Sequence, residues 1–393
     1  MQIYSFLARK ENISLKKTPF FAFCHLKTLN FALFIRCDMI KDGSDFACRL
    51  LAWYHENGRI LPWRGTRDPY VVWISEIILQ QTRVSQGHDY FLRFVERFPD
   101  VGTLAAASED EVLKCWQGLG YYSRARNLHA AARQVVERGG FPDTYPDIRK
   151  MKGVGDYTAA AIASFAFGLP YAVVDGNVYR VLSRFFGVEE PIDTGRGRRY
   201  FAALAQELLP ETGLVAGYNQ ALMDFGAMQC VPKGADCGVC PLSDGCVAFR
   251  DGRVRDFPVK SRSLAVKERY LHYIYIKVGG ETALFRREGN DIWKGLYEPW
   301  LMETEEACPP ERLWDLEGMP VSLCRKEAVR TLLCEGVRHQ LTHRTLVCDL
   351  QVVELPEKPA DLGRKAVWVR AGELTGFAFP RLVAKWLERF SLT

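Results

Sequence analysis

Four closely spaced cysteines are the side chains of this sequence that most clearly indicate chemistry. Their spacing is C-x6-C-x2-C-x5-C, whereas the rest of the twelve cysteines are scattered through the 393 residues: the four are Cys230, Cys237, Cys240 and Cys246. Thiolates are soft ligands, so four of them on one loop can hold either a tetrahedral zinc ion or a four-iron four-sulfur cluster. The ligand chemistry leaves both open. Because unrelated thiols would not gather so densely, we predict a metal centre on this loop.

A glutamate among apolar residues is the first candidate for acid catalysis. Glu76 lies in the string WISEIILQQT, where Trp73, Ile77 and Leu79 would surround it with apolar surface. Burial disfavours a charged carboxylate, so it would raise the pKa of Glu76 to roughly 6–7, where a carboxylic acid donates a proton at neutral pH. The alternative is a solvent-facing glutamate on an amphipathic helix.

An aspartate at the start of a helical pattern is the second candidate. Asp175 opens the string DGNVYRVL, which is a natural place for a helix N-cap. Helix-terminal N–H groups stabilise an anion, so this carboxylate is expected to stay ionised. A neutral acid and an anion together suit cleavage of a bond to an anomeric carbon, because one protonates the leaving group and the other stabilises positive charge on the sugar.

A short glycine turn predicts a phosphate contact. The segment from Met151 to Ala159 contains Gly153 and Gly155 just before an apolar helix, and Lys152 precedes them. Backbone N–H groups and the dipole at a helix N-terminus favour a phosphate, so the turn can grip a DNA backbone without reading its sequence. The alternative is a tight turn with no ligand.

The elements that must position these residues fall into two predicted domains. Apolar residues recur at helical spacing from Asp45 to about Arg250, so the first domain reads as mainly α. Residues 251–268 lack an apolar period and predict a linker. Residues 270–278 predict a strand that Gly279 and Gly280 turn into a hairpin, within a mixed α and β domain at 269–393.

Composition sets limits on the class of protein. A hydrophobic fraction of 48% in 393 residues allows two cores, and the net charge of +5 permits a nucleic-acid partner without requiring one. Scattered cysteines without a secretory signal indicate a reducing compartment, such as the bacterial cytoplasm. Residues 1–38 show no periodic pattern, so we expect an extension or a start codon placed too far upstream, with the first domain at 39–250.

The order of these motifs resembles that of the MutY glycosylases, in the helix–hairpin–helix superfamily of endonuclease III. The resemblance covers residues 45 to about 250, and its motifs are LPWR at 61–64, SEIILQQT at 75–82, GLGYYSRARNLH at 118–129, the glycine turn, DGNVYRVL at 175–182 and the cysteine loop. It implies a mainly α glycosylase domain that holds a 4Fe-4S cluster at 230–246. It also implies removal of adenine that is mispaired with 8-oxoguanine or guanine in double-stranded DNA. Nothing in the sequence supports oligomerisation, so we expect a monomer.

The resemblance assigns roles to individual residues. Glu76 would protonate the departing adenine at N7 and Asp175 would stabilise the sugar cation, while Tyr157 and Asn177 would assist at the same centre. Further residues match the family's positions for the adenine pocket (Arg59, Trp63, Leu79 and Gln220) and for the wedge that opens the duplex (Gln81 and Tyr121). The wedge would offset the unstacking penalty of base flipping, which is a few kcal/mol.

One position separates this chain from strand-cutting relatives. Those relatives carry a lysine two residues after the second hairpin glycine, and it forms a Schiff base with the sugar, but here Tyr157 occupies that position. The resemblance therefore implies hydrolysis by water that leaves the strand uncut. Lys152 replaces the family's usual proline, and we interpret it as a phosphate contact.

The second domain is similar to the MutY C-terminal domain, which is related to Nudix hydrolases. The segment 293–299 reads WKGLYEP, and 338–343 reads RHQLTH, where Leu341, Thr342 and His343 replace the family's phenylalanine-serine-histidine. Thr342 and His343 would hydrogen-bond the 8-oxoguanine. Since the glutamate-rich REx2E helix of Nudix hydrolases is missing, we expect no nucleotide hydrolysis.

Two other functions compete with this interpretation. A bifunctional pyrimidine glycosylase of the endonuclease III type shares the hairpin and the cluster loop, but Tyr157 and the extra domain argue against it. A non-catalytic DNA-binding module would use the metal and the hairpin only to hold a duplex, but the paired acids Glu76 and Asp175 argue against that.

Overall fold

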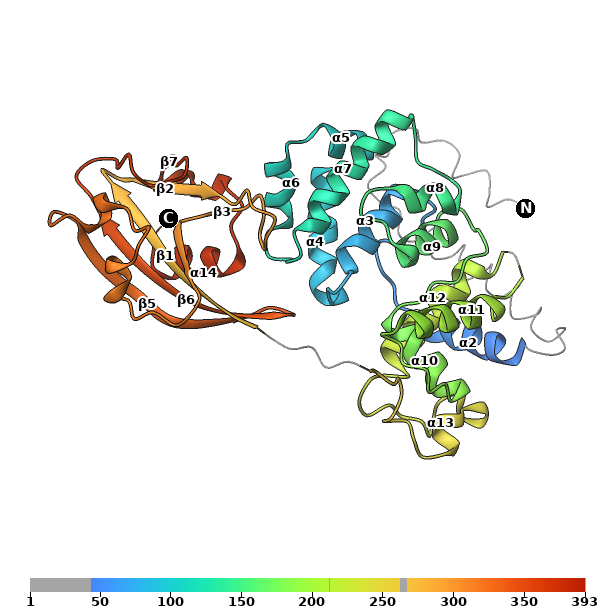
Figure 1. Cartoon of the computed structure of the whole chain (residues 1–393). Helices are drawn as coiled ribbons and strands as arrows, with labels where there is room; N and C mark the ends of the chain where they lie inside the picture. Colours follow the sequence, from blue (N-terminus) through green and yellow to red (C-terminus); the bar gives the residue numbers. More distant parts are fainter. Residues whose placement is uncertain (1–43, 212, 262–266, 393) are drawn as a thin grey trace, which may run out of the picture. The chain divides into compact units, whose positions relative to one another are not determined.

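The chain folds into two units, seen in a computed structural model that describes residues 44–211, 213–261 and 267–392 (Figure 1). Of the described residues, the first unit contains those from 44 to 77 and from 141 to 261, and the second contains those from 78 to 140 and from 267 to 392. The prediction for residues 1–38 lies outside the described residues. The division into domains at 39–250 and 269–393 stays a prediction.

The first unit is helical. Its helices are α2 (Ser44–Asn57), most of α3 (Pro69–Leu79), α8 (Tyr145–Lys150), α9 (Asp156–Phe165), α10 (Gly176–Phe186), α11 (Gly195–Glu207), α12 (Val215–Met228) and α13 (Val247–Arg250). Apolar side chains at helical spacing on α10 pack against α2, α11 and α12, so Val178, Val181 and Leu182 share one core with Phe201 and Phe225. This core fixes the start of α10, where Asp175 lies.

The glycine turn lies between two helices, as the sequence indicates. Thr144 caps α8, and α9 begins at Asp156 immediately after Gly155. Gly153 has φ +75°, a left-handed conformation that side chains with a Cβ disfavour. Alanines along α9 are fully or almost fully buried, which lets neighbouring segments pack closely around the residues that follow the turn.

Helices also open the second unit. They are α4 (Val84–Arg97), α5 (Val101–Ala106), α6 (Glu109–Trp116) and α7 (Ser123–Arg138). Ser108 and Glu111 form a capping box at the start of α6, and Gly139 ends α7 with φ +86°. Phe94 and Trp116 meet edge to face in the core between α4 and α6, with ring centroids 5.8 Å apart.

A mixed seven-stranded sheet forms the rest of the second unit. Its strands and helix are β1 (Lys267–Val278), β2 (Glu281–Arg286), β3 (Tyr297–Glu298), β4 (Trp300–Thr304), β5 (Val329–Gln340), β6 (Arg344–Glu354), β7 (Val367–Arg370) and α14 (Arg381–Arg389). The strand order is β3-β2-β1-β6-β5, with β4 against β1 and β7 against β2. β1 runs parallel to β6 and antiparallel to β2, which confirms the predicted hairpin at Gly279 and Gly280.

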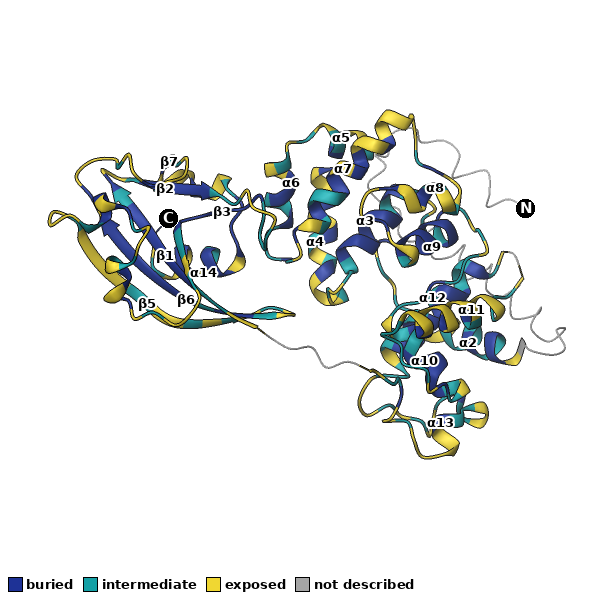
Figure 2. Cartoon of the chain, viewed as in Figure 1, coloured by how far each residue is buried: buried dark blue, intermediate teal, exposed yellow. Residues whose placement is uncertain are grey.

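β1 is buried on both faces, which explains its nearly continuous apolar sequence (Figure 2). Tyr273 and Tyr275 share a core with Trp386 of α14, whereas Ile274 and Ile276 belong to a second core. Because alternate side chains of a strand point to opposite faces, the two cores lie on the two sides of the sheet.

The sheet domain and helix α6 contact each other within the second unit. Arg286 pairs with Glu109 and Asp110, and Lys114 donates to the Phe377 carbonyl oxygen at 2.8 Å. These contacts hold the sheet against the helices of residues 78–140.

The predicted linker is partly packed. The Val259 carbonyl accepts a hydrogen bond from the Ile192 amide at 3.1 Å, and Ser261 bonds to Asp193, so residues up to 261 lie along the first unit. The strand β1 begins at Lys267, inside the stretch predicted as linker. In the described part of the chain, no helix has the length and hydropathy that crossing a bilayer requires.

Candidate functional site

Glu76 is a buried acid. It lies on α3 with 6% of its surface exposed, and the Tyr157 hydroxyl donates to its Oε2 at 2.7 Å. Burial raises the pKa of Glu76 to about 7, against the opposing effects of the Tyr157 hydrogen bond and the Arg64 charge. The acid is therefore half protonated near neutral pH, which suits a group that donates a proton.

Asp175 is the N-cap of α10, which confirms the helix boundary predicted from the sequence. Its Oδ1 accepts the backbone N–H groups of Asn177 (2.9 Å) and Val178 (2.8 Å), and its Oδ2 accepts from the Asn177 side-chain amide at 2.8 Å. The cap alone would lower the pKa, but burial outweighs these hydrogen bonds and raises the pKa of Asp175 above its ordinary value. Desolvation of the carboxylate therefore acts against the helix N–H groups that stabilise its charge.

The two carboxyl groups act on each other electrostatically. The charge of Asp175 contributes to the raised pKa of Glu76, so the two groups lie within interaction distance although α3 and α10 are far apart in sequence. Glu76 holds a proton in about half of the molecules near pH 7, and Asp175 is a carboxylate that accepts helix N–H groups. This combination can protonate a leaving group while it stabilises a cationic sugar carbon.

A buried arginine joins the start of α10 to the cysteine loop. Arg180 donates to the Asn177 side-chain oxygen at 2.8 Å, and its Nε donates to the Cys230 carbonyl at 2.7 Å. Gly226 allows the close packing, since a Cβ there would lie 2.6 Å from the Asn177 Cβ. Arg180 thus connects Asn177, whose side chain bonds Asp175, to the segment that begins the cysteine loop.

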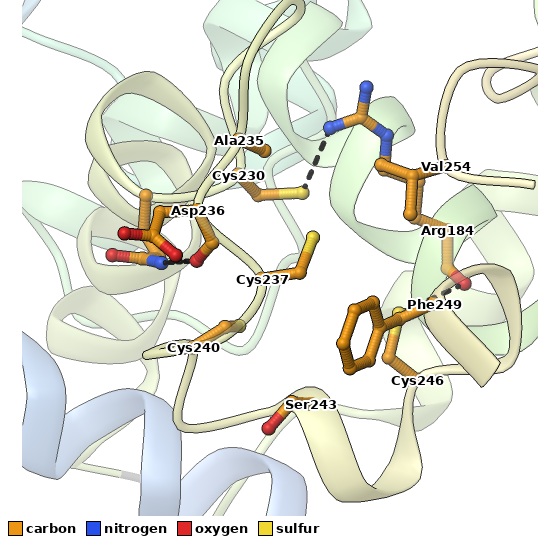
Figure 3. A pocket seen from close by; sticks show the side chains of 11 residues that line it. Arg184, Cys230, Ala235, Asp236, Cys237, Cys240, Ser243, Cys246, Phe249 and Val254 are labelled. Atoms are coloured by element: carbon orange, nitrogen blue, oxygen red, sulfur yellow. Dashed lines mark hydrogen bonds between the residues drawn. The ribbon is translucent and has the colours of Figure 1, made fainter. Parts of the chain in front are cut away.

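The four clustered cysteines line one cavity (Figure 3). Arg184 also lines it and donates to the Cys230 sulfur at 3.3 Å, while the same guanidinium bonds the Val231 carbonyl at 2.8 Å. Cysteine sulfur binds a metal as the thiolate, a soft ligand. The donor set fits a thiolate-ligated metal centre. Within residues 44–211, 213–261 and 267–392, however, no three histidine, cysteine or acidic side chains are arranged to hold a single metal ion.

A charged network surrounds the fully buried Asp224. Arg64 donates to both of its carboxylate oxygens, at 2.6 and 2.7 Å, and Arg59 bonds it through its backbone N–H and its guanidinium. Tyr54 links Arg64 to Gln220, because its hydroxyl accepts from Arg64 and donates to Gln220 Oε1 at 3.0 Å. The network brings together Arg59 and Gln220, two of the residues predicted for a base pocket.

The other two predicted pocket residues are Trp63 and Leu79. Trp63, which precedes Arg64 in the sequence, is buried in the first unit. Leu79 is the last residue of α3 and belongs to the second unit. The structure therefore groups Arg59, Trp63 and Gln220 in the first unit.

The predicted wedge residues Gln81 and Tyr121 both have strained backbones. Their φ angles are +57° and +46°, in the left-handed region that side chains with a Cβ rarely adopt, at a cost of about 1–3 kcal/mol each. Both are exposed, and Tyr121 contacts the Thr342 hydroxyl by a short hydrogen bond. A residue keeps such a strained backbone only where the surrounding structure holds it in place.

The remaining predicted residues lie on the surface. Lys152, Gly153 and Gly155 are exposed in the turn between α8 and α9. Thr342 and His343 are exposed at the tip of the hairpin between β5 and β6. Each group is therefore open to a large ligand.

Four arginine or aspartate side chains with clear structural roles did not stand out in the sequence. Each has at least one bonding partner far away in the chain, which no local pattern reveals: they are Arg124, Arg180, Arg184 and Asp224. The spacing of Arg180 and Arg184, one turn apart on the helix that follows Asp175, is the only sequence signal that could have indicated two of them.

Two family descriptions match this chain. Residues 74–207 match the HhH-GPD superfamily of base excision DNA repair proteins, and residues 272–389 match the NUDIX domain. These matches, with the helices and the mixed sheet, confirm the predicted fold class of a helix–hairpin–helix domain followed by a Nudix-like domain.

Similarity to one relative extends along most of this chain. The adenine DNA glycosylase of Buchnera aphidicola subsp. Acyrthosiphon pisum (strain APS) is 31% identical over 356 residues, which are 88% of this chain and 97% of that protein. The adenine DNA glycosylase of Mus musculus is 40% identical over 222 residues, 54% of this chain and 43% of that protein. The solved structure of a thermostable thymine-DNA glycosylase matches with a TM-score of 0.50 and 32% identity, over 53% of this chain and 97% of that one.

Proposed function

This chain belongs to the adenine DNA glycosylase family of the helix–hairpin–helix superfamily, and on that premise we propose that it hydrolyses the bond between adenine and deoxyribose where the adenine faces 8-oxoguanine or guanine. Its role is in base excision repair of double-stranded DNA. The observation that carries the proposal is the buried Glu76, bonded by Tyr157 and within the electrostatic reach of Asp175.

Each group at this centre has a role in the reaction. Glu76 protonates the departing adenine, and because its pKa is about 7 it holds that proton in a large fraction of molecules at neutral pH. Asp175 stabilises positive charge on the sugar. Asn177 and Arg180 position Asp175, since they hold its Oδ2 and the start of α10.

Tyr157 supports a reaction that leaves the DNA strand uncut. Burial raises the pKa of Tyr157 well above its ordinary value, so the phenol stays neutral and donates to Glu76. A neutral phenol cannot form the Schiff base that an amine forms with the sugar. Water is therefore the nucleophile.

Other residues contact the DNA around the target base. Arg59, Trp63, Leu79 and Gln220 line the adenine pocket, and Gln81 and Tyr121 enter the duplex as a wedge. Lys152, Gly153 and Gly155 hold a backbone phosphate, because the exposed turn precedes the N-terminus of α9. Thr342 and His343 at the hairpin tip hydrogen-bond the 8-oxoguanine.

A base-excision assay tests this function. The protein is incubated with duplexes that place adenine opposite 8-oxoguanine, guanine or thymine, and half of each sample is then treated with alkali to cut abasic sites. We expect cut strands only after alkali, and only from the 8-oxoguanine and guanine duplexes. Cutting without alkali would overturn the hydrolytic mechanism, and an absence of cutting from every duplex would overturn the function.

The cysteine cavity is proposed to hold a 4Fe-4S cluster. Superfamily members of the endonuclease III type generally carry one, and the four thiols and the Arg184 donor fit a thiolate-ligated group. Cys230, Cys237, Cys240 and Cys246 would hold the cluster, and this shared ligation would make their loop rigid. Since Arg180 bonds the Cys230 carbonyl, rigidity of the loop also supports the start of α10.

Metal analysis of single-cysteine variants tests the cluster. We expect the purified protein to be brown, with broad visible absorbance, and Cys237→Ser to lose most of that absorbance and of its bound iron. The matched control is Cys308→Ser, because Cys308 lies outside the cavity and its loss should leave both unchanged. A colourless wild-type protein that contains zinc would refute the cluster assignment while leaving the glycosylase assignment intact.

A further inference from the structure

Arg124 bonds two segments that are far apart in the sequence. Its guanidinium donates to four backbone carbonyl oxygens, two on each segment: Ile78 (3.1 Å) and Gln80 (2.6 Å) through Nη1, and Leu119 (3.5 Å) and Gly120 (3.3 Å) through Nη2. The first segment is the end of α3, and the second is the turn between α6 and α7. One planar side chain with fixed donor directions therefore sets the separation of the two segments.

The bonded carbonyls lie immediately before the two strained residues. The Gln80 carbonyl belongs to the peptide group that precedes Gln81, and the Gly120 carbonyl belongs to the peptide group that precedes Tyr121. The peptide group is planar, so fixing its orientation restricts the φ rotation of the residue that follows it. Since φ is +57° at Gln81 and +46° at Tyr121, both residues adopt a conformation that relaxes unless the surrounding structure restrains it.

The same guanidinium packs against aromatic rings. Its carbon lies 5.2 Å from the Trp116 ring centroid and 5.6 Å from the Tyr121 ring centroid, and the Trp116 indole itself donates to the Gly120 carbonyl at 3.1 Å. Burial lowers the pKa of Arg124 to about 10, so it remains charged at neutral pH. The side chain is thus held in place by both stacking and hydrogen bonds.

We propose that Arg124 is a positioning residue that presets Gln81 and Tyr121 together for insertion into DNA. This inference rests on the proposed wedge role of the two residues. A wedge that is already in its inserted conformation loses less conformational entropy on binding, so more of the binding free energy is left to unstack the target base. Arg124 touches neither the adenine nor the reacting bond. Its effect should therefore depend on whether the duplex has to be opened.

The test compares Arg124→Met with two other variants. Methionine retains the apolar contact with Trp116 but has no donor, and Arg124→Lys retains the charge with fewer donors. The matched control is Arg133→Met, because Arg133 is an exposed arginine of the same helix whose donors reach the Ala105 carbonyl and His129 instead. Single-turnover adenine excision is measured on a paired duplex with adenine opposite 8-oxoguanine. It is also measured on the same duplex with mismatched pairs on both sides of the adenine.

We expect Arg124→Met to slow excision from the paired duplex at least tenfold and from the mismatched duplex less than threefold. Arg124→Lys should fall between Arg124→Met and the wild type, and Arg133→Met should match the wild type on both substrates. If Arg124→Met slowed excision equally on the two substrates, or slowed it on neither, the proposal would be overturned.

Hydrogen exchange supplies a readout that needs no catalysis. Backbone amides in 79–82 and 118–121 should exchange faster in Arg124→Met than in the wild type, and by similar factors in both segments. Faster exchange in one segment only, or in neither, would overturn the joint positioning. If the wild type excised no adenine from either duplex, the proposed function would fail, and hydrogen exchange would still decide whether Arg124 holds both segments.

Discussion

Replacing Glu76 by glutamine lowers the rate of adenine excision by about 10²–10⁴-fold, which is the usual contribution of a positioned general acid. Glutamine has nearly the same shape and can still accept the Tyr157 hydrogen bond, but it has no proton to give to the departing base. The measurement is single-turnover excision at pH 7 with enzyme in excess. A variant with more than a tenth of the wild-type rate would show that the proton comes from elsewhere.

The pH dependence of the wild type follows from the same carboxyl group. Because the pKa of Glu76 is raised to about 7, its protonated form is depleted as the pH rises above 7, and the rate should fall about tenfold for each further pH unit. The Tyr157 hydrogen bond lowers the pKa of Glu76, and Tyr157→Phe removes it. The excision rate of this variant should therefore begin to fall at a higher pH than that of the wild type. A wild-type rate that is flat between pH 7 and 9 would contradict the assignment of Glu76 as the acid.

Folding stability supplies the control for Glu76→Gln. The folded protein holds the Glu76 proton more tightly than the unfolded chain, where the pKa has its ordinary value of 4.5. The wild type therefore loses stability as the pH rises from about 4.5 to about 7, by at most about 3 kcal/mol. Glutamine carries no such proton, so the variant should be more stable than the wild type at pH 8 and lose that advantage near pH 5. Denaturant unfolding at the two pH values measures the difference, and a destabilised variant at pH 8 would mean that its lost activity reflects misfolding.

Local patterns were sufficient to predict where the acid, the cap and the hairpins lie. Apolar neighbours along one helix made a buried Glu76 one of two alternatives, which the structure decides, and an aspartate before an apolar period indicated the start of α10. Alternation and glycines indicated the hairpin of β1 and β2. Each of these features depends on residues a few positions apart, so periodicity and turn chemistry describe them well.

Features that depend on distant residues could not be predicted in this way. The partner of Glu76 is Tyr157, 81 positions away, and the partners of Asp224 are more than 150 positions away. The burial that raises the pKa of Asp175 is set by the packing of the whole unit, so the capping pattern alone did not indicate it. Resemblance to a family indicated which residues meet at the site, and its motif at 118–129 includes Arg124, but it assigned no role to this residue, whose bonds are to backbone atoms.

Asp175→Asn is expected to lower the excision rate by about 10²–10³-fold without unfolding the protein, which is the cost of losing one preorganised electrostatic group. Asparagine is as good an N-cap as aspartate, so its side-chain oxygen can still accept the N–H groups of Asn177 and Val178. What the substitution removes is the negative charge that stabilises a cationic sugar. The rate is measured on the duplex with adenine opposite 8-oxoguanine, and far-UV circular dichroism checks that the helices persist.

A second capping aspartate makes the comparison specific. Asp100 caps α5 by accepting the Thr103 amide at 2.7 Å, and it lies in the other unit, on the surface. Asp100→Asn makes the same chemical change at the same kind of helix position, so it should leave the rate within about twofold of the wild type. If Asp100→Asn lowered the excision rate as much as Asp175→Asn does, the loss would be an effect of helix capping on the fold. A loss confined to Asp175 instead identifies a charge that acts on the reacting sugar, because geometry and capping are retained in both variants.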